Sequence, residues 1–367
     1  MTDNSKAKLI ILTAGGTGGH VFPADALAQE LSNRAYRLML VTDKRGLNNY
    51  HGKLGEIENR AVSSGALVGK SNWFKLISLC KLAFGVLQSL WIILRNRPMC
   101  IIGFGGYASF PCCVAAVILG KPLIIHEQNS VMSRTNRFLA KYASIVATSF
   151  TDTKYAPADE RTIRTGMPIR PTISNLFGKK YQPAENVFNL LVLGGSQGAK
   201  IFAEIIPQAV KLLDSATQSK LRIIQQCRQD DVKKLEEEYK NTACTATIAH
   251  FFENMPQLYS DCHLIISRAG ASSVSEIAAA GIPSVLVPLP TAADNHQFFN
   301  AAEFEHNQGG IVIKQKELSA EKLAGILKDL INSPQKLNDF SANTKKFAVT
   351  DADKRLADLT EKIIKES

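Results

Sequence analysis

The sequence predicts an α/β protein built from two Rossmann-like domains whose parallel sheets face a cleft. Three observations support this fold class. The chain has 367 residues, which is too long for a single hydrophobic core. Short aliphatic runs alternate with longer amphipathic stretches, as in βαβ units. The two halves also begin alike, because an apolar run, a glycine-rich turn and a helical segment occur both at 9–19 and from 190 onward.

The expected strands are short apolar runs that are rich in β-branched residues. In the N-terminal half they are residues 9–12, 38–41, 100–104, 122–126 and 145–148. In the C-terminal half they are residues 190–193, 221–225, 247–251, 264–267, 284–287 and 311–313. Longer helical patterns separate these runs, so each half is predicted to form a parallel sheet covered by helices.

We expect an N-terminal domain over 1–166, a linker over 167–186, a C-terminal domain over 187–350 and a C-terminal helix over 351–367. The linker is placed where Gly and Pro gather and where the charge balance changes. Asp351 and Asp353 open the last helix, and helix capping explains this pair better than metal binding does.

Charge is distributed unevenly along the chain. The 43 Lys and Arg residues against 33 Asp and Glu give a net charge of +10. Residues 1–170 hold 21 basic and 10 acidic side chains, whereas residues 171–367 hold 22 and 23. No acidic residue occurs from 59 to 126. We therefore expect a basic surface on the first domain, suited to a polyanionic partner.

The composition is that of a globular protein, with 45% hydrophobic and 21% charged residues, which excludes long disorder. Seven cysteines include no CxxC pair, which argues against a disulfide framework and a zinc site and predicts a reducing compartment. The N-terminus is polar and the apolar run after it is too short for a signal peptide, so we expect the cytoplasm. No set of potential ligands has metal-site spacing, so we expect no metal and no other cofactor.

One segment, residues 73–94, is apolar almost all round, with a narrow polar stripe at steps of three or four. Its length suffices to span a bilayer, but two lysines interrupt it and it lies inside a βαβ series. A buried core helix and a membrane-surface helix remain as alternatives. The acid-free stretch around it favours the membrane, because anionic lipid attracts basic residues. The residues expected at the membrane are Trp73, Phe74, Leu76, Ile77, Lys81 and Trp91.

The first glycine-rich turn, Gly15-Gly-Thr-Gly-Gly-His20, follows a strand and opens a helix. Its backbone amides and the helix N-terminus can hold a diphosphate. A dinucleotide site would use Asp43 as its ribose-binding acid, although a strict motif needs glycine where Val21 stands. The structural alternative is a tight turn that needs glycine only for its conformation. His20 lies on the first helical turn, where the dipole favours neutral imidazole, which makes it a candidate general base.

The second turn, Gly194-Gly-Ser-Gln-Gly198, matches the GxSxG of a hydrolase nucleophile elbow, with Ser196 as the nucleophile. The other triad members would be Asp261 with His263 or Asp294 with His296. Each of these pairs is local in sequence, and the symmetric first loop would then have no role. As a phosphate loop, the same segment would offer the Ser196 hydroxyl and several amides to a leaving diphosphate.

A third motif, residues 267–276, is predicted to be a strand end followed by a glycine turn and a capped helix. Glu276 lies in the first turns of that helix, where a carboxylate can accept hydrogen bonds from both hydroxyls of a ribose. The simpler alternative is a negative charge that complements the helix N-terminus. Asp294-Asn-His-Gln297 and Asn300 add side chains that suit sugar hydroxyls.

Taken in order, these motifs resemble those of the MurG family. They are Gly15-Gly-Thr-Gly-Gly-His-Val-Phe-Pro-Ala24, Gly103-Phe-Gly-Gly-Tyr107, His126-Glu-Gln-Asn129, Gly166-Met-Pro-Ile-Arg170, Gly194-Gly-Ser-Gln-Gly-Ala199, Arg268-Ala-Gly-Ala-Ser-Ser-Val-Ser-Glu-Ile277 and Asp294-Asn-His-Gln297. The resemblance implies the GT-B fold. It also implies an inverting transferase that moves GlcNAc from UDP-GlcNAc to the 4-hydroxyl of the muramoyl sugar of lipid I, giving lipid II for peptidoglycan.

The resemblance also implies roles for single residues, with the donor mainly in the C-terminal domain and the acceptor mainly in the N-terminal one. His20 would be the general base, with Glu127 as the second candidate. Glu276 would bind the ribose, and Ser196 and Arg170 the donor diphosphate. The uridine would contact Phe252 and the backbone of Ala271, Ser272, Ser273, Val274 and Ser275. The sugar would be held or covered by Thr17, Gly18, Gly19, Asn129, Gln297 and Asn300.

The partners implied are UDP-GlcNAc, lipid I, an anionic membrane surface and other cell-wall synthesis proteins, with no nucleic acid. The expected location is the cytoplasmic face of the inner membrane, as a peripheral protein. A UDP-GlcNAc epimerase of the same architecture is the closest alternative, but it would not need an apolar, basic helix. A membrane-recruited binding subunit without activity is a further alternative, against which the presence of both glycine loops and His20 argues.

Overall fold

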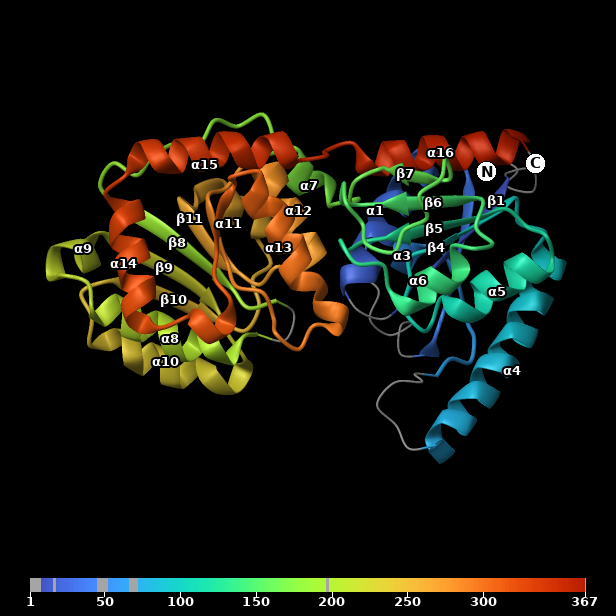
Figure 1. The fold of residues 1–367 in the computed structure, drawn as a ribbon, viewed down its shortest axis with the longest axis horizontal. Coiled ribbons are helices and arrows are strands. Elements are labelled where there is room, and N and C mark those ends of the chain that lie inside the picture. Colours follow the sequence, from blue (N-terminus) through green and yellow to red (C-terminus); the bar gives the residue numbers. More distant parts are fainter. Residues whose placement is uncertain (1–7, 16–17, 45–51, 66–71, 196–197, 367) are drawn as a thin grey trace. The chain divides into compact units, whose positions relative to one another are not determined.

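The computed structural model describes residues 8–15, 18–44, 52–65, 72–195 and 198–366 (Figure 1). The chain divides into two compact units. The first is Met1–Arg170 together with Asp351–Ser367, and the second is Pro171–Thr350. Each unit is built on one parallel sheet with covering helices, which confirms the predicted fold class.

The first unit contains a seven-stranded sheet in the order β3-β2-β1-β4-β5-β6-β7, and all its pairs are parallel. Its strands are β1 (Leu9–Thr13), β2 (Arg37–Thr42), β3 (Glu58–Ala61), β4 (Cys100–Gly103), β5 (Leu123–Glu127), β6 (Ile145–Thr148) and β7 (Thr162–Arg164). The order reverses at β1, so the loops after β1 and β4 lie at the switch point, where open α/β sheets bind ligands.

Helices cover both faces of this sheet because its central strands are apolar on both sides. The helices are α1 (Gly18–Asn33), α3 (Lys53–Glu56), α4 (Asn72–Asn96), α5 (Phe110–Ile118), α6 (Arg134–Leu139) and α16 (Ala352–Glu366). Ile10 and Leu12 of β1 face the core shared with α1 and α16, whereas Leu9 and Ile11 face the core shared with α4 and α5.

The last helix, α16, crosses back to the first unit and packs along α1 (Figure 1). Leu356, Ala357 and Ile364 are buried in the core beside α1. At the rim of this contact, the guanidinium of Arg34 lies 2.6 Å from the carboxylate of Asp358. The end of the chain therefore stabilises the N-terminal sheet.

The second unit contains a six-stranded parallel sheet in the order β10-β9-β8-β11-β12-β13. Its strands are β8 (Phe188–Leu193), β9 (Leu221–Gln226), β10 (Thr245–Ala249), β11 (Leu264–Ser267), β12 (Ser284–Leu286) and β13 (Gly310–Val312). Its helices are α7 (Pro171–Ser174), α8 (Lys200–Lys211), α9 (Ser215–Lys220), α10 (Val232–Lys240), α11 (Met255–Asp261), α12 (Ala271–Ala280), α13 (His296–His306), α14 (Ala320–Ile331) and α15 (Pro334–Phe347), with short 3-10 turns at Gln229–Asp231, Ala293–Asn295 and Gln315–Glu317.

The predicted strands are confirmed with small shifts, the largest being β10, which begins and ends two residues before the predicted 247–251. Two strands were not predicted, β3 and β7, both at sheet edges. Their residues, Glu-Asn-Arg-Ala and Thr-Ile-Arg, are half-buried or exposed and lack an apolar run. The aliphatic pattern identifies the central strands but not these edges.

Candidate active site

In the first unit, the loop after β1 packs closely against the loop after β4. The backbone N–H of Gly15 donates to the carbonyl of Gly105 over 3.2 Å. Gly105 and Gly106 have φ angles of +82° and +79°, a conformation that favours glycine. A Cβ added at Gly15 would lie 3.3 Å from the Cα of Gly106, a tight contact that favours glycine at this position. Thr17 lies outside the described residues.

His20 follows Gly18 and Gly19 in the first turn of α1, and its ring lies over the two glycines of the β4 loop. Ring atoms of His20 would be 3.4 Å from a Cβ at either Gly105 or Gly106. The Nδ1 atom of His20 is 3.1 Å from Oε1 of Gln128, which follows β5. The predicted base is therefore held by glycine backbone and by one amide side chain.

The same glutamine also contacts His126, which is fully buried at the end of β5. Nε2 of Gln128 lies 3.1 Å from Nδ1 of His126 and donates to the Phe104 carbonyl over 2.9 Å. Nε2 of His126 is 3.1 Å from the carbonyl oxygen of Gly166. A continuous hydrogen-bonded chain thus runs from His20 to the backbone that follows β7.

Because it is buried, His126 has its pKa lowered from 6.5 to about 4. Between these values the unfolded chain binds a proton that the folded protein does not, so stability falls as the pH drops through this window. The lowered pKa corresponds to a loss of about 3 kcal/mol in the free energy of unfolding near pH 4, relative to neutral pH. In urea unfolding, the free energy of unfolding is expected to fall less from about pH 7 to about pH 4.5 for His126→Gln than for wild type. Equal losses would contradict this. Burial also lowers the pKa of His263, but this histidine affects the pH dependence of stability equally in wild type and in His126→Gln.

Glu127 is buried beside His126, and hydrogen-bond donors occupy both of its carboxylate oxygens. Oε1 accepts from the backbone N–H of Asn129 over 3.1 Å and from its side-chain amide over 3.4 Å. Oε2 accepts from the N–H of Ser133 over 2.9 Å and from Nδ2 of Asn136 over 2.8 Å. This carboxylate organises the loop between β5 and α6, including Asn129.

Arg170 is the last residue of the first unit, where its guanidinium lies 5.6 Å from the ring centroid of Phe22 in α1. Ser196, the other residue expected at the donor diphosphate, lies outside the described residues. The expected pairing of these two residues therefore stays a prediction.

In the second unit, Glu276 is 6% exposed on α12, and its Oε2 atom accepts a hydrogen bond from the Tyr259 hydroxyl over 3.1 Å. Tyr259 lies on α11 and is buried, so one carboxylate oxygen is fixed from a neighbouring helix. At the start of α12, Gly270 gives no side-chain cap to the first backbone amides. Within the described residues, the buried Oγ atom of Ser272 also has no hydrogen-bond partner. This helix start, with Ala271, offers donors to an anion.

The loop after β12 is held by side chains from two sides. Arg268 is buried after β11, and its guanidinium donates to the carbonyls of Val287 and Pro288. Gln297 accepts from the backbone N–H of Leu289 over 3.0 Å. Asn300 is buried and donates over 3.1 Å to the carbonyl of Ala269, just before α12. Gln297 and Asn300 are thus brought to the same end of the sheet as Glu276.

The other predicted donor-site residues lie at the same end of the sheet or on α12. Phe252 is half-buried in the loop between β10 and α11. Ser273 and Ser275 are half-buried and Val274 is buried on α12.

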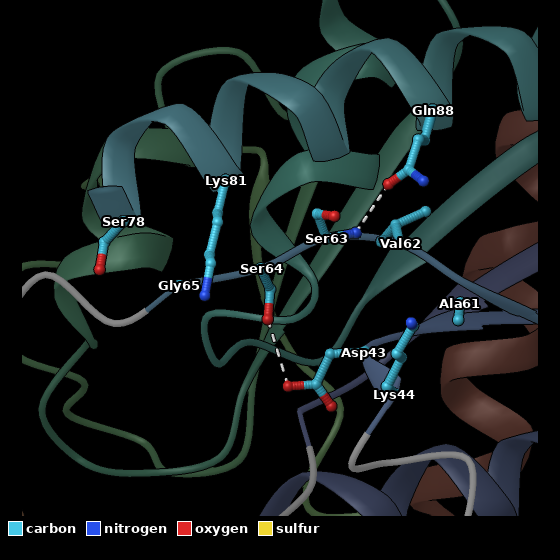
Figure 2. A pocket seen from close by; sticks show the side chains of 10 residues that line it. All are labelled: Asp43, Lys44, Ala61, Val62, Ser63, Ser64, Gly65, Ser78, Lys81 and Gln88. Atoms are coloured by element: carbon cyan, nitrogen blue, oxygen red, sulfur yellow. Dashed lines mark hydrogen bonds between the residues drawn. The ribbon is translucent and has the colours of Figure 1, made fainter. Parts of the chain in front are cut away.

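Asp43, which a dinucleotide site would use, follows β2 and accepts a hydrogen bond from the Ser64 hydroxyl over 3.2 Å. It lines a cavity of about 420 Å³ between the ends of β2 and β3 and the helix α4 (Figure 2). Lys44 and Lys81 line the same cavity, so its charge is mixed. Within the described residues, no group of three or more His, Cys, Asp or Glu side chains is placed to hold a metal ion.

The helix α4 connects β3 to β4 and presents part of its polar stripe to the protein. Ser78 and Ser89 are buried, and a Cβ at Gly85 would lie 2.0 Å from the carbonyl oxygen of Ser63. Oε1 of Gln88 accepts from the N–H of Ser63 over 2.8 Å. Part of the stripe found in the sequence therefore packs inward together with apolar residues such as Leu82, whereas many large apolar side chains of α4 face outward.

The large side chains exposed on α4 are Trp73, Leu76, Ile77, Leu79, Phe84, Leu87, Trp91 and Leu94. Ile118 of α5 and Phe138 and Tyr142 near α6 are exposed as well. Lys81 is exposed on α4, and the Arg95 guanidinium lies 5.5 Å from the Trp91 ring centroid. The side chain of Phe74 lies outside the described set. Within the described residues, α4 is the one helix long and apolar enough to cross a membrane, over Leu76–Asn96.

Comparison with known proteins defines the class. The model of the glycosyltransferase family 28 N-terminal domain matches residues 10–148, and that of the C-terminal domain matches residues 189–356. The crystal structure of Acinetobacter baumannii MurG superimposes with a TM-score of 0.80 at 31% identity, covering 97% of this chain and 99% of that one. The fold is that of a GT-B glycosyltransferase.

Relatives in two bacteria carry the name UDP-N-acetylglucosamine--N-acetylmuramyl-(pentapeptide) pyrophosphoryl-undecaprenol N-acetylglucosamine transferase. The Rhodospirillum rubrum protein is 42% identical over 95% of this chain and 90% of its own length. The Paramagnetospirillum magneticum protein is 42% identical over 97% of both chains. The chain therefore belongs to the MurG family and is an N-acetylglucosamine transferase. A Listeria monocytogenes UDP-N-acetylglucosamine 2-epimerase, 10% identical with a TM-score of 0.70, shares the fold alone.

Four residues that contact the site were not predicted to have a role. Gln128 lies within the quoted His126-Glu-Gln-Asn129 motif, and Arg268 opens another, so the motifs contained a signal for both. Asn136 and Tyr259 lie outside the motifs, and only the folded chain brings them to Glu127 and Glu276.

Proposed function

We propose that this enzyme transfers GlcNAc from UDP-GlcNAc to the 4-hydroxyl of the muramoyl sugar of lipid I, with His20 as the general base. The observation that carries this proposal is the position of His20, at the start of α1 beside the glycine loops of the sheet's switch point. The names of the relatives describe the same transfer.

The reaction is a single displacement. The acceptor O4 forms a bond to C1 of GlcNAc while the bond from C1 to the β-phosphate oxygen breaks, and UDP leaves with that electron pair. The hydroxyl proton passes to His20 and then to solvent. Configuration at C1 inverts, and no covalent enzyme intermediate forms.

Glu127 is the less suitable base and the better positioning residue. Its four donors commit both carboxylate oxygens to the loop that carries Asn129. A base needs a lone pair directed at the substrate hydroxyl. We therefore assign the proton transfer to His20 and the shape of the acceptor loop, with Asn129, to Glu127.

The donor occupies the second unit in this proposal. Glu276, oriented by Tyr259, accepts the ribose hydroxyls, and the start of α12 from Ala271 to Ser275 lies along the uridine side with Phe252. Ser196, Arg170 and the amides of the glycine loops neutralise charge on the departing diphosphate. Gln297 and Asn300 hold the sugar end of the donor.

Membrane association follows from the acceptor, which is a lipid, and from the outward apolar face of α4. We propose that Trp73, Leu76, Ile77 and Trp91 enter the interface of the inner membrane from its cytoplasmic side, with Lys81 at anionic headgroups. The many large apolar side chains that stay exposed on α4 support this placement, because a crossover helix of a globular protein normally buries such side chains.

Replacing two exposed residues of α4 by acids, Leu87→Glu with Trp91→Glu, is expected to weaken binding to anionic vesicles by more than about tenfold. Both side chains are exposed, so folding is preserved. Cosedimentation with vesicles measures the effect. The matched control is Leu212→Glu, which changes an exposed leucine of the second unit and is expected to leave binding unchanged. Binding that survives the double change would place the membrane contact elsewhere.

The direct test of the proposed function is transfer of labelled sugar from UDP-GlcNAc to a lipid I analogue. Label is expected in the lipid only when the acceptor is present. Conversion of UDP-GlcNAc without acceptor would instead indicate an epimerase.

A further inference from the structure

We propose that Gln128 is a positioning residue that fixes the tautomer of His20 and so selects Nε2 as the nitrogen that receives the acceptor proton. This inference rests on the proposed role of His20 as the base. It adds a residue whose part is to orient the imidazole, without contact with the substrate.

The orientation of the Gln128 amide follows from its neighbours. One end of the amide lies 2.9 Å from the carbonyl oxygen of Phe104 and 3.1 Å from that of His126. Carbonyl oxygens only accept hydrogen bonds, so this end is the NH₂ group. The opposite end, which faces Nδ1 of His20 at 3.1 Å, is therefore the amide oxygen.

An amide oxygen has no proton to give, so the hydrogen bond requires a proton on Nδ1 of His20. A neutral imidazole carries one ring N–H, which leaves the lone pair on Nε2. Gln128 thus imposes the tautomer in which Nε2 can take up the hydroxyl proton.

His126 keeps the amide from turning over. Its Nε2 atom is 3.1 Å from the Gly166 carbonyl and must donate to it, so its Nδ1 atom accepts from the NH₂ of Gln128. Burial, which lowers the pKa of His126 to about 4, keeps this ring neutral at physiological pH. If the Gln128 amide were reversed, its oxygen would face three acceptors, namely the carbonyl oxygens of Phe104 and His126 and Nδ1 of His126, and no hydrogen bond could form.

Other neighbours of His20 set the place of the ring rather than its tautomer. Gly105 and Gly106 lie beside the ring, since a Cβ at either would be 3.4 Å from an imidazole carbon, and Nδ2 of Asn136 donates to Glu127 and to the His126 carbonyl. The amide oxygen of Gln128 is the acceptor that faces Nδ1 of the ring.

The test is ¹⁵N–¹H correlation NMR of the full-length protein labelled at histidine, near neutral pH, with the His20 signal identified by its loss in His20→Gln. In wild type we expect the His20 proton on Nδ1. In Gln128→Leu we expect a shift toward the Nε2–H form, with kcat at least about tenfold lower and the KM for UDP-GlcNAc unchanged.

Ser109→Ala is the matched control, because Ser109 is buried and its hydroxyl donates to the Gly106 carbonyl of the same loop without touching Gln128. It is expected to leave tautomer and kcat unchanged. A wild-type His20 protonated on Nε2 would overturn the proposal by itself, whether or not the leucine variant folds. Full activity of His20→Gln would instead refute the role of His20 as the base. The tautomer of His20 would still be read from the wild-type NMR spectrum, so the two failures can be distinguished.

Discussion

Replacing His20 with alanine is expected to lower kcat for sugar transfer by about 10²- to 10⁴-fold, the usual contribution of a general base. The imidazole lies on the first unit and Glu276 on the second, so the KM for UDP-GlcNAc should change little. Steady-state kinetics with a water-soluble lipid I analogue separates the two constants.

The control for this variant is His306→Ala, an exposed histidine at the end of α13. It is expected to behave as wild type. If His20→Ala keeps wild-type kcat, the base lies elsewhere, and Glu127 becomes the next residue to change.

Replacing Glu276 with alanine is expected to raise the KM for UDP-GlcNAc by about 10²-fold, because hydrogen bonds from two hydroxyls to a carboxylate are lost at about 1.5 kcal/mol or more each. The carboxylate is buried and held by the Tyr259 hydroxyl, so it is already oriented before the nucleotide binds. Tyr259→Phe removes that orientation alone and should raise KM only several-fold. Titration calorimetry with UDP gives the same comparison without turnover.

The comparison variant is Glu321→Ala, an exposed carboxylate at the start of α14 that is expected to have no effect. An unchanged KM in Glu276→Ala would show that the ribose does not bind at α12.

Much of this architecture could be predicted because buried parallel strands are nearly continuous apolar runs, as in β1 and β11. His20 and Glu276 could be singled out because each follows a glycine turn at the start of a helix. The residues that orient these two side chains could not be predicted, since Gln128 lies 108 residues from His20 and Tyr259 lies on a different helix from Glu276. The exact orientation of α4 also needed the structure, because this helix buries some of its apolar residues, such as Leu82 and Ile93, and leaves others, such as Trp91, exposed.

The stereochemistry of the product tests the central claim most directly. UDP-GlcNAc carries an α-linked sugar, and a single displacement activated by His20 inverts C1. NMR of the disaccharide formed on a lipid I analogue is predicted to show a β linkage to O4 of the muramoyl sugar. An α linkage, or a sugar nucleotide epimerised at C2 with no disaccharide, would contradict the mechanism proposed for this chain.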